Sequence, residues 1–370
     1  MLKSFSVKNY KNFKDGIKLS FDNVRDYSFN TNCINQGLLS KIIVFGENAS
    51  GKSNLGYALF DIVGVLTDNR IVTQQLNNLY NADSSSKIME FSYEFQFDND
   101  IVLYSYKKEE TYNNLVFEEL YFNGKTVYQF DYKKKEFVDN CNLELINANS
   151  LSIDFSNLSI SFLRVVANNT VQKEDDIVKK IIKFVNSMLF FKSLQVNDYI
   201  GLESSLTFIE DWIVNNGLID DFNKFINQFT SNKSQLVSNK LLDHSVILEK
   251  HKYYSLNFKE VASSGTLSLE VFYFWYKKLD KVKFLYIDEF DAFYHMELSL
   301  SIIRLLLELK DIQIVLTSHN TRLADNDLLR PDCYFTLNDG KIKSFADSTE
   351  RELRQGHNLE KMMRQGEFNV

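Results

Sequence analysis

Eight residues near the start of the chain have the spacing of a phosphate-binding loop: glycine, four variable residues, then glycine, lysine and serine. The compact apolar run Lys41–Phe45 precedes them, and apolar residues at helical spacing follow. In such a loop the backbone N–H groups point toward phosphate oxygens, and the glycines let the phosphates approach closely. We therefore expect ATP to bind the loop Gly46, Glu47, Asn48, Ala49, Ser50, Gly51, Lys52 and Ser53, continued by Asn54.

Two side chains of this loop and two later acids have the chemistry of phosphoryl transfer. Lys52 would contact the β- and γ-phosphates, and the Ser53 hydroxyl would bind Mg²⁺. The apolar run 284–287 ends in Asp288 and Glu289, which places both carboxylates at the C-terminal end of a predicted strand. Asp288 would hold the Mg²⁺ shell, and Glu289 would be the general base that orients the attacking water.

A histidine and a serine-glycine pair complete the candidate residues. His319 follows the apolar run Ile312–Leu316, where it could hydrogen-bond the γ-phosphate or the attacking water and sense hydrolysis. Ser264 and Gly265 open a helical pattern, and such a turn presents N–H groups and a hydroxyl to an anion. A lone histidine is more often structural and a serine-glycine turn is an ordinary helix cap, so their position near the acidic pair gives them their weight.

Hydrophobic periodicity predicts the elements that must position these residues. Apolar residues alternate on both sides of a turn at 14–16, which predicts two N-terminal strands, and again over about 87–138, which predicts an antiparallel meander. Asn123 and Gly124 supply the positive φ angles of a type I′ hairpin turn inside that meander. Residues 172–250 have helical spacing, which predicts a helical insert.

The order of these elements predicts an α/β fold with a mixed, mainly parallel central sheet that carries the motifs at its strand ends. We expect three parts along the chain. An N-terminal lobe at 1–171 holds the phosphate loop and the meander, a helical insert spans 172–250, and a C-terminal lobe at 251–370 holds the remaining motifs and a closing tail.

The composition excludes several classes of protein. The net charge of −7 argues against a generally basic nucleic-acid coat, although it leaves room for a local basic groove. Cys33, Cys141 and Cys333 have no paired spacing, so we expect reduced thiols rather than a disulfide framework or a zinc site. The chain has no apolar run of membrane-spanning length and no signal-peptide pattern at its start, so we expect a cytoplasmic protein without membrane contact.

These motifs, in this order, resemble the ABC-type P-loop ATPase domains of the RecF, SMC and OLD branch. The resemblance implies hydrolysis of ATP with Mg²⁺ by a homo-oligomer, at least a dimer. In it, Ser264 and Gly265 would close over the γ-phosphate of ATP bound to a second subunit. The opening segment Val7–Asp15 resembles that branch's N-terminal strand and turn, which implies that Lys11 and Asn12 contact the nucleotide.

Two further features of the branch have counterparts in this chain. Residues 289–295 match its D-loop region. The branch also carries a glutamine between the phosphate loop and the signature that binds Mg²⁺. Gln74 and Gln75 follow the first predicted helix and could both take this role, with Gln96 as a weaker candidate, and we assign Gln75 as the Mg²⁺ ligand.

The tail 351–368 is similar to the end of a bacterial family of AAA-type proteins that includes RloA/AbiL-like abortive-infection ATPases and the ATPase half of the PARIS system. This similarity implies an anti-phage switch that controls a separate effector, a nuclease encoded nearby, with a nucleic acid or a phage protein as trigger. The alternative is a RecF-like ATPase that acts on DNA in repair. The segment after His319 is too short for the Toprim domain of an OLD-type nuclease, so we expect no nuclease activity from the chain itself.

Overall fold

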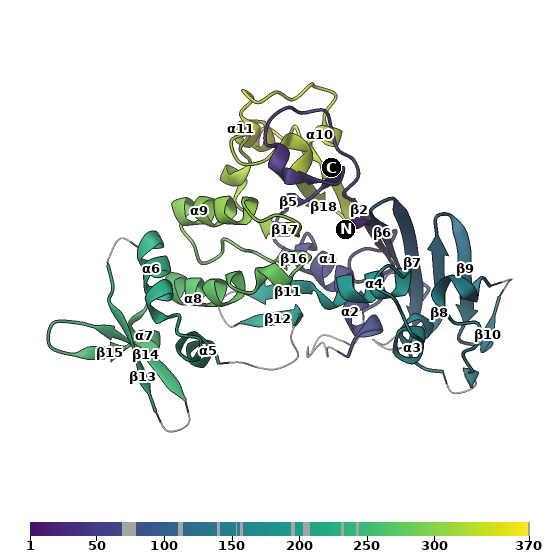
Figure 1. Cartoon of the computed structure of the whole chain (residues 1–370). Coiled ribbons are helices and arrows are strands. Elements are labelled where there is room, and N and C mark those ends of the chain that lie inside the picture. The colour runs from purple at the N-terminus through teal and green to yellow at the C-terminus, as the bar shows by residue number, and fades with distance from the viewer. Residues whose placement is uncertain are drawn as a thin grey trace.

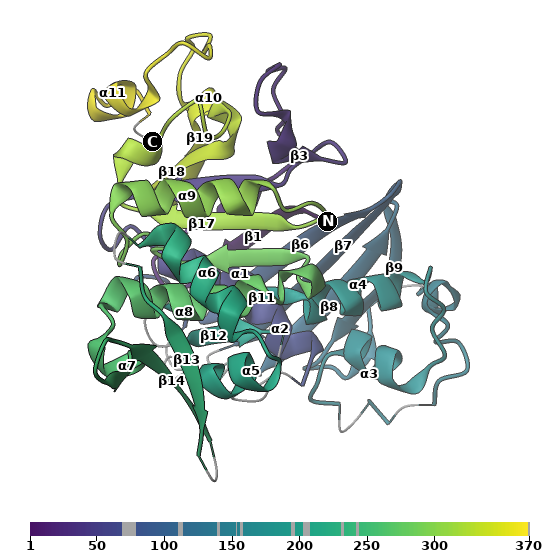
Figure 2. The same cartoon turned by 60° about the vertical axis from the view of Figure 1, so that its left-hand side comes forward.

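Two seven-stranded sheets form the body of the molecule, and a smaller three-stranded sheet projects from one side (Figure 1). The antiparallel sheet and the central sheet lie beside each other, with helices around them (Figures 1 and 2). The computed structural model describes residues 1–68, 79–109, 114–138, 141–152, 154–155, 158–193, 197–202, 208–230, 233–241 and 244–368.

The central sheet is mainly parallel, as predicted. Its strand order is β12-β11-β16-β17-β5-β18-β19, and only the edge strands β12 and β19 run antiparallel to their neighbours. Every residue of β5, β16 and β17 is buried, as expected for parallel strands covered on both faces. The strands are β5 (Lys41–Phe45), β11 (Met188–Ser193), β12 (Asp198–Gly201), β16 (Phe284–Ile287), β17 (Gln313–Ser318), β18 (Tyr334–Asn338) and β19 (Lys341–Ser344).

The second sheet contains the predicted N-terminal hairpin and the predicted meander in one antiparallel array, in the order β10-β9-β8-β7-β6-β1-β2. Buried and half-buried residues alternate along β6, which matches a strand with one face toward the core. Asn123 and Gly124 have φ angles of 49° and 76°, so the predicted type I′ turn is confirmed. The strands are β1 (Leu2–Lys8), β2 (Ile17–Ser20), β6 (Ile88–Phe97), β7 (Asp100–Glu109), β8 (Leu115–Phe122), β9 (Lys125–Asp131) and β10 (Glu136–Phe137).

Helices connect the sheets and pack around them. α2, α3 and α4 contact one another, and α5 and α6 both contact α8. Within the part of the chain that the structure describes, none of the helices has the length and apolar character that crossing a membrane requires. The helices are α1 (Lys52–Leu59), α2 (Asp61–Leu66), α3 (Phe162–Asn169), α4 (Ile177–Asn186), α5 (Ile209–Asn215), α6 (Ile219–Phe229), α7 (Phe258–Val261), α8 (Ser264–Tyr276), α9 (Met296–Leu307), α10 (Phe345–Ser348) and α11 (Leu359–Arg364).

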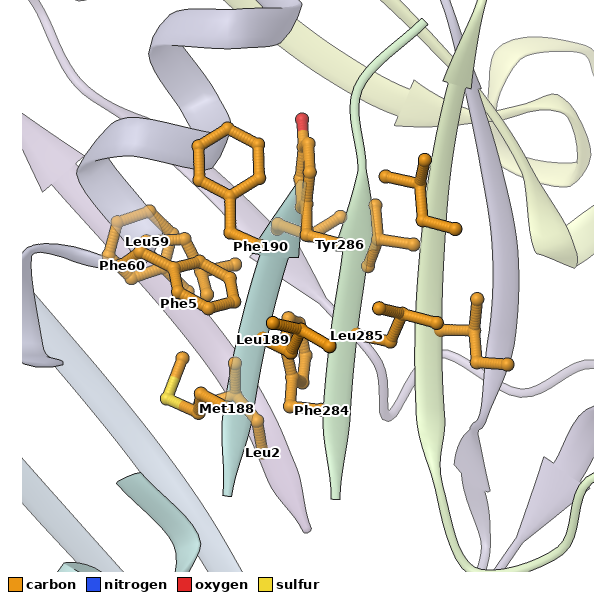
Figure 3. Packing of buried hydrophobic residues seen from close by; sticks show 14 of the residues in the cluster. Leu2, Phe5, Leu59, Phe60, Met188, Leu189, Phe190, Phe284, Leu285 and Tyr286 are labelled. Carbon is orange, nitrogen blue, oxygen red and sulfur yellow. The ribbon is translucent and has the colours of Figure 1, made fainter. Parts of the chain in front are cut away.

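The core joins the two large sheets beneath the phosphate loop. Phe60, which follows α1, has its ring centroid 5.3 Å from that of Phe190 in β11 and 6.0 Å from that of Phe284 in β16. Leu2 and Phe5 of β1 belong to the same cluster, as Figure 3 shows. Such aromatic pairs contribute roughly 0.5–1.5 kcal/mol beyond the burial of their area, so this cluster holds α1 firmly against both sheets.

The segment 172–250 is only partly the helical insert that its periodicity predicts. It forms α4, α5 and α6, but it also contributes β11 and β12 to the central sheet. It then enters the small sheet of β13 (Leu236–Lys240), β14 (Ser245–Lys250) and β15 (Ser255–Asn257). Periodicity alone does not separate a short buried strand from a helix, which is why the apolar run of β11 was misassigned. The predicted division of the chain at residues 171 and 250 stays a prediction.

Candidate active site

Three motifs meet at one edge of the central sheet because they follow neighbouring parallel strands. The phosphate loop follows β5, the acidic pair follows β16, and His319 follows β17. Leu316 of β17 pairs with Ile43 of β5 on one side and with Ile287 of β16 on the other. Parallel strands end at the same edge of a sheet, so residues from three distant parts of the chain converge there.

The backbone of the phosphate loop requires its glycines. Gly51 has a φ of 108°, and a Cβ atom there would collide with the side chain of Asn12. A Cβ atom on Gly46 would lie 2.5 Å from Oγ of Ser50 and 2.7 Å from the carbonyl oxygen of Leu337. The Ser50 hydroxyl is buried and lacks a hydrogen-bond partner in the described part of the chain. A buried polar atom without a partner is costly, so this hydroxyl fits a loop that receives a polar ligand.

Lys52 lies folded back over the loop. Its ammonium donates to the carbonyl oxygens of Gly46 at 2.9 Å and Glu47 at 3.0 Å, and it lies 3.3 Å from Nδ1 of His319. An ammonium group only donates, so Nδ1 of His319 is the acceptor in this contact. Burial lowers the pKa of Lys52, while the nearby carboxylates oppose that shift. The Lys52 ammonium is therefore hydrogen-bonded to neutral carbonyl oxygens of the loop. Charged phosphate oxygens would be stronger acceptors for it.

A hydroxyl and a carboxylate lie together where a divalent cation would bind. Ser53 Oγ donates to Oδ2 of Asp288 at 2.5 Å, and Thr317 Oγ1 donates to Oδ1 at 2.6 Å. Burial raises the pKa of Asp288, and the bonds from these two hydroxyls counteract part of that rise. Carboxylate and hydroxyl oxygens are hard ligands of the kind that Mg²⁺ prefers, so the two side chains fit the predicted metal site.

Glu289 is held in an unusual backbone conformation beside the loop. Its φ is 44°, a region that costs a non-glycine residue about 1 kcal/mol or more. Its N–H donates to Thr317 Oγ1 at 2.8 Å, and its Oε1 lies 3.0 Å from Nε2 of His319. With Nδ1 accepting from Lys52, Nε2 carries the proton and donates to Glu289. His319 thus connects the loop lysine to the candidate general base.

The predicted signature, Ser264 and Gly265, lies apart from the phosphate loop of its own chain. Ser263 caps α8 by accepting from the N–H of Thr266 at 3.2 Å, so the cap residue is one position before the predicted pair. Among the described residues, no hydrogen bond joins Ser264 or Gly265 to residues 46–53. Figure 1 places the start of α8 beside α7, while α1 lies nearer the antiparallel sheet. A Cβ atom on Gly265 would lie 3.0 Å from the Phe293 carbonyl oxygen, in the predicted D-loop region.

The N-terminal turn, whose Lys11 and Asn12 are predicted to contact the nucleotide, lies against the phosphate loop. The amide of Asn12 donates to the carbonyl of Ser50 at 3.1 Å, and Asn54 donates to Oδ1 of Asn12 at 2.7 Å. The ammonium of Lys11 lies 5.6 Å from the centroid of the Tyr57 ring, and burial lowers its pKa. The predicted ligand Gln75 lies outside the described residues, as does Gln74.

Thr317 and Tyr286 received no role in the sequence interpretation, and Asp291 was placed only within the D-loop match. Thr317 holds both Asp288 and the backbone of Glu289, and its position two residues before His319 was the signal available. In the sequence pattern, Tyr286 is only one more residue of the apolar run that forms β16. In the structure, its hydroxyl donates to the carbonyl of Lys52 at 2.7 Å. Asp291 accepts from Ser318 Oγ at 2.9 Å, which connects the D-loop region to the end of β17.

Three solved structures match over nearly their whole length at low similarity. An SMC head bound to the C-winged helix domain of ScpA gives a TM-score of 0.46 at 16% identity, over 98% of this chain and 99% of that one. An SMC head domain from Thermotoga maritima gives 0.43 at 13%, over 93% and 98% of the two chains. The recombination mediator protein RecF gives 0.43 at 15%, also over 93% and 98%. A comparison with curated protein sequences finds no match.

A family model matches residues 42–325, and its description is "AAA domain, putative AbiEii toxin, Type IV TA system". The matched segment is more than half of the chain, and it contains the phosphate loop, α8, the acidic pair and His319. The sheet order and the motifs at its strand ends agree with a mixed α/β P-loop ATPase of the AAA/ABC type. The chain therefore belongs to this family of AAA-domain ATPases.

Proposed function

We propose that the protein is an ATP-driven switch that binds ATP between two protomers and hydrolyses it there. The observation that carries this proposal is the separation of two motifs in one chain. The phosphate loop, Asp288, Glu289 and His319 are assembled at one sheet edge, whereas Ser264 at the start of α8 is exposed and makes no hydrogen bond to that loop in the described part of the chain. A second protomer that presents its own α8 would complete the site.

The residues of the chain divide the chemistry between them. Lys52 exchanges its loop carbonyls for the β- and γ-phosphates and neutralises their charge. Glu289 accepts the proton of the attacking water, and His319 keeps Glu289 in position while contacting Lys52. Ser53 and Asp288 would hold Mg²⁺, which when bound supplies charge neutralisation at the phosphates.

The biological role that best fits the family is phage defence. The family description names AbiEii and a toxin–antitoxin system, which supports an abortive-infection ATPase in the cytoplasm that controls a separate effector, a nuclease encoded nearby. Closure of the dimer on ATP and reopening after hydrolysis would hold or release that effector. A RecF- or SMC-like ATPase that acts on DNA in repair is the alternative. Loss of phage protection in cells carrying Glu289→Gln together with the neighbouring genes would support the first role. Sensitivity to DNA damage without such a loss would support the second.

A mixing experiment tests the shared site. Lys52→Ala removes the loop lysine, and Ser264→Glu places a negative charge where the γ-phosphate of the partner's ATP would lie. Each variant alone should hydrolyse almost no ATP. An equal mixture should recover about a quarter of wild-type turnover, because half of the dimers are mixed and each mixed dimer has one intact site.

Two results would contradict this scheme. Normal turnover by Ser264→Glu alone would mean that one chain forms the complete site. No recovery in a mixture whose mixed dimers are confirmed by native mass spectrometry would contradict the exchange of α8 between protomers. Ser159→Glu is the matched control, because Ser159 is also an exposed serine and lies outside every motif.

A further inference from the structure

The small sheet of β13, β14 and β15 projects from the body and ends in an exposed turn (Figure 1). All seven residues from Lys250 to Leu256 are exposed. Within them, Tyr253 and Tyr254 have 76% and 77% of their surface accessible. Adjacent tyrosines with both rings in solvent are unusual on a soluble protein, because aromatic rings are normally buried or used at an interface.

The turn that carries the two rings has a defined shape. The N–H of His251 donates to the carbonyl of Tyr254 at 2.8 Å, which closes the turn between β14 and β15. The ladder continues below it through Lys250 paired with Ser255 and Leu248 paired with Asn257. The two tyrosines are therefore presented on an ordered hairpin.

The charge at this turn is opposite to that of the whole chain. Lys250, His251 and Lys252 stand directly before the tyrosines, and the ammonium of Lys252 lies 5.0 Å from the centroid of the Tyr253 ring. The nearest acid in sequence, Glu249, accepts from Ser234 Oγ at 3.0 Å, and the same carboxylate oxygen lies 3.8 Å from Nε2 of His251, so the two lysines carry the positive charge of the turn. The turn thus presents cations and aromatic faces together on a chain with a net charge of −7.

We propose that this turn, residues 250–254, binds single-stranded nucleic acid. Aromatic rings stack on unpaired bases, and lysines contact the phosphates between them. A partner protein with a purely acidic surface would pair with the lysines, but it would leave the faces of both tyrosine rings without a stacking partner. The inference deepens the proposed switch, and for its biological meaning it rests on that function, because it assigns a nucleic acid as the trigger.

The turn is connected to the signature helix by a short and well-packed path. β15 leads directly into α7 and then α8, and Phe258 at the start of α7 is buried. Its ring centroid lies 5.8 Å from that of Phe222 in α6, which lies 5.0 Å from that of Tyr273 in α8. Lys259 of α7 also pairs with Glu210 of α5 at 3.6 Å. A nucleic-acid strand bound at the turn would therefore be coupled through α7 to α8, the helix that would present Ser264 to the second protomer.

The test measures binding to the full-length chain, without ATP, of a fluorescein-labelled oligothymidylate or oligouridylate of about 20 nucleotides, long enough to span such a site. Tyr253→Ala combined with Tyr254→Ala should weaken binding about tenfold or more, since each stacked base is lost with its ring. Phe208→Ala is the matched control and should leave affinity unchanged, because Phe208 is as exposed as the tyrosines and lies outside the turn. Lys250→Gln combined with Lys252→Gln should reduce the slope of log K against log salt by about 1.4.

Each remaining outcome overturns the inference. If wild type and the double tyrosine variant have the same affinity, or if neither binds, the turn is not a nucleic-acid site. If the tyrosine variant instead loses ATP-dependent dimers and keeps its oligonucleotide affinity, the turn contacts a second copy of the chain. Because binding is measured without ATP, failure of the mixing experiment leaves this result unaffected, and the two proposals fail separately.

Discussion

Two buried glutamates, one in the antiparallel sheet and one in the predicted signature helix α8, differ in how completely their carboxyl groups are hydrogen-bonded. Glu118 of β8 is fully buried and accepts from the hydroxyls of Tyr104 at 3.0 Å and Tyr128 at 2.8 Å. Its other donors are Tyr132 Oη, Ser161 Oγ, and the N–H groups of Phe162 and Leu163. Glu270 of α8 is 3% exposed, and its Oε1 has no partner in the described part of the chain.

Glu118 is a structural anchor, whereas Glu270 has a buried oxygen atom that lacks a hydrogen-bond partner in the described part of the chain. Glu118 joins the meander to the start of α3, where a carboxylate also complements the helix N-terminus. Burial raises the pKa of Glu270 to about 7, since Glu210 adds to this rise and only Lys259 opposes it. At the candidate ATP site, the buried hydroxyl of Ser50 likewise has no hydrogen-bond partner among the described residues. Glu118 is thus satisfied by donors of its own fold, whereas Oε1 of Glu270 and Oγ of Ser50 lack partners in the described part of the chain, in regions where we propose that a second protomer or ATP docks.

The largest effect is expected at the ATP site itself. Glu289→Gln should lower ATP turnover by about 10²–10⁴-fold, because the variant loses the proposed general base but keeps the shape of the side chain. ATP binding should persist and favour the closed dimer. Phosphate release and size-exclusion chromatography with ATP measure the two effects. An unfolding free energy that fell together with turnover would place Glu289 in the structural class with Glu118.

In the antiparallel sheet, Glu118→Ala should lower the unfolding free energy by about 4 kcal/mol, because several buried donors lose a charged acceptor at once. Urea unfolding at neutral pH measures the change. ATP turnover of the folded variant should stay at the wild-type level. Glu119→Ala is the matched control, since the neighbouring Glu119 is only half-buried and should cost much less. A small loss for Glu118 would remove the distinction between the two regions.

The pH dependence of the unfolding free energy tests the contrast between the two glutamates at Glu270. A carboxyl whose folded pKa is raised from 4.5 to about 7 stays protonated in the folded state while the unfolded state releases its proton. Its contribution therefore lowers stability as pH rises from about 4.5 to about 7, and the full penalty remains above that. Glu270→Gln should regain up to about 3 kcal/mol of unfolding free energy at pH 8 and nothing at pH 4. Equal changes at both pH values, or a similar gain with the exposed Glu260→Gln, would contradict this role.

A pair of buried tyrosines gives the smallest effect. Tyr286 donates to the carbonyl of Lys52, and Tyr93 of β6 donates to the carbonyl of Ala58 at 3.0 Å. Replacing Tyr286 with phenylalanine should lower the unfolding free energy by about 1 kcal/mol, the usual value of one hydrogen bond. Replacing Tyr93, whose hydroxyl also lies 3.2 Å from that of Tyr106, should lower it by about 1–2 kcal/mol. Only Tyr286→Phe should also weaken ATP affinity, measured by isothermal titration calorimetry. Equal ATP affinities of the two variants would show that the Tyr286 bond has no part in shaping the loop.

Much of the candidate site was predictable because its motifs are local. A phosphate loop works through its own backbone, so glycine spacing and the flanking apolar run identify it without tertiary information. The acidic pair and His319 were predictable for a related reason, since each follows an apolar run that ends abruptly in polar residues. The role of Thr317 was not predictable, because its bonds to Asp288 and Glu289 depend on how β16 and β17 are aligned.

By itself, the sequence determined the strands and helices with strong periodicity, the type I′ turn at Asn123 and Gly124, and the residues that meet at the end of the central sheet. Only the tertiary structure placed β11 inside that sheet, because a short apolar run becomes a strand through neighbours distant in the chain. The tertiary structure also separated Ser264 from the phosphate loop and buried Oε1 of Glu270 without a partner among the described residues. Burial and hydrogen bonding are properties of the packed chain, and a local pattern does not contain them.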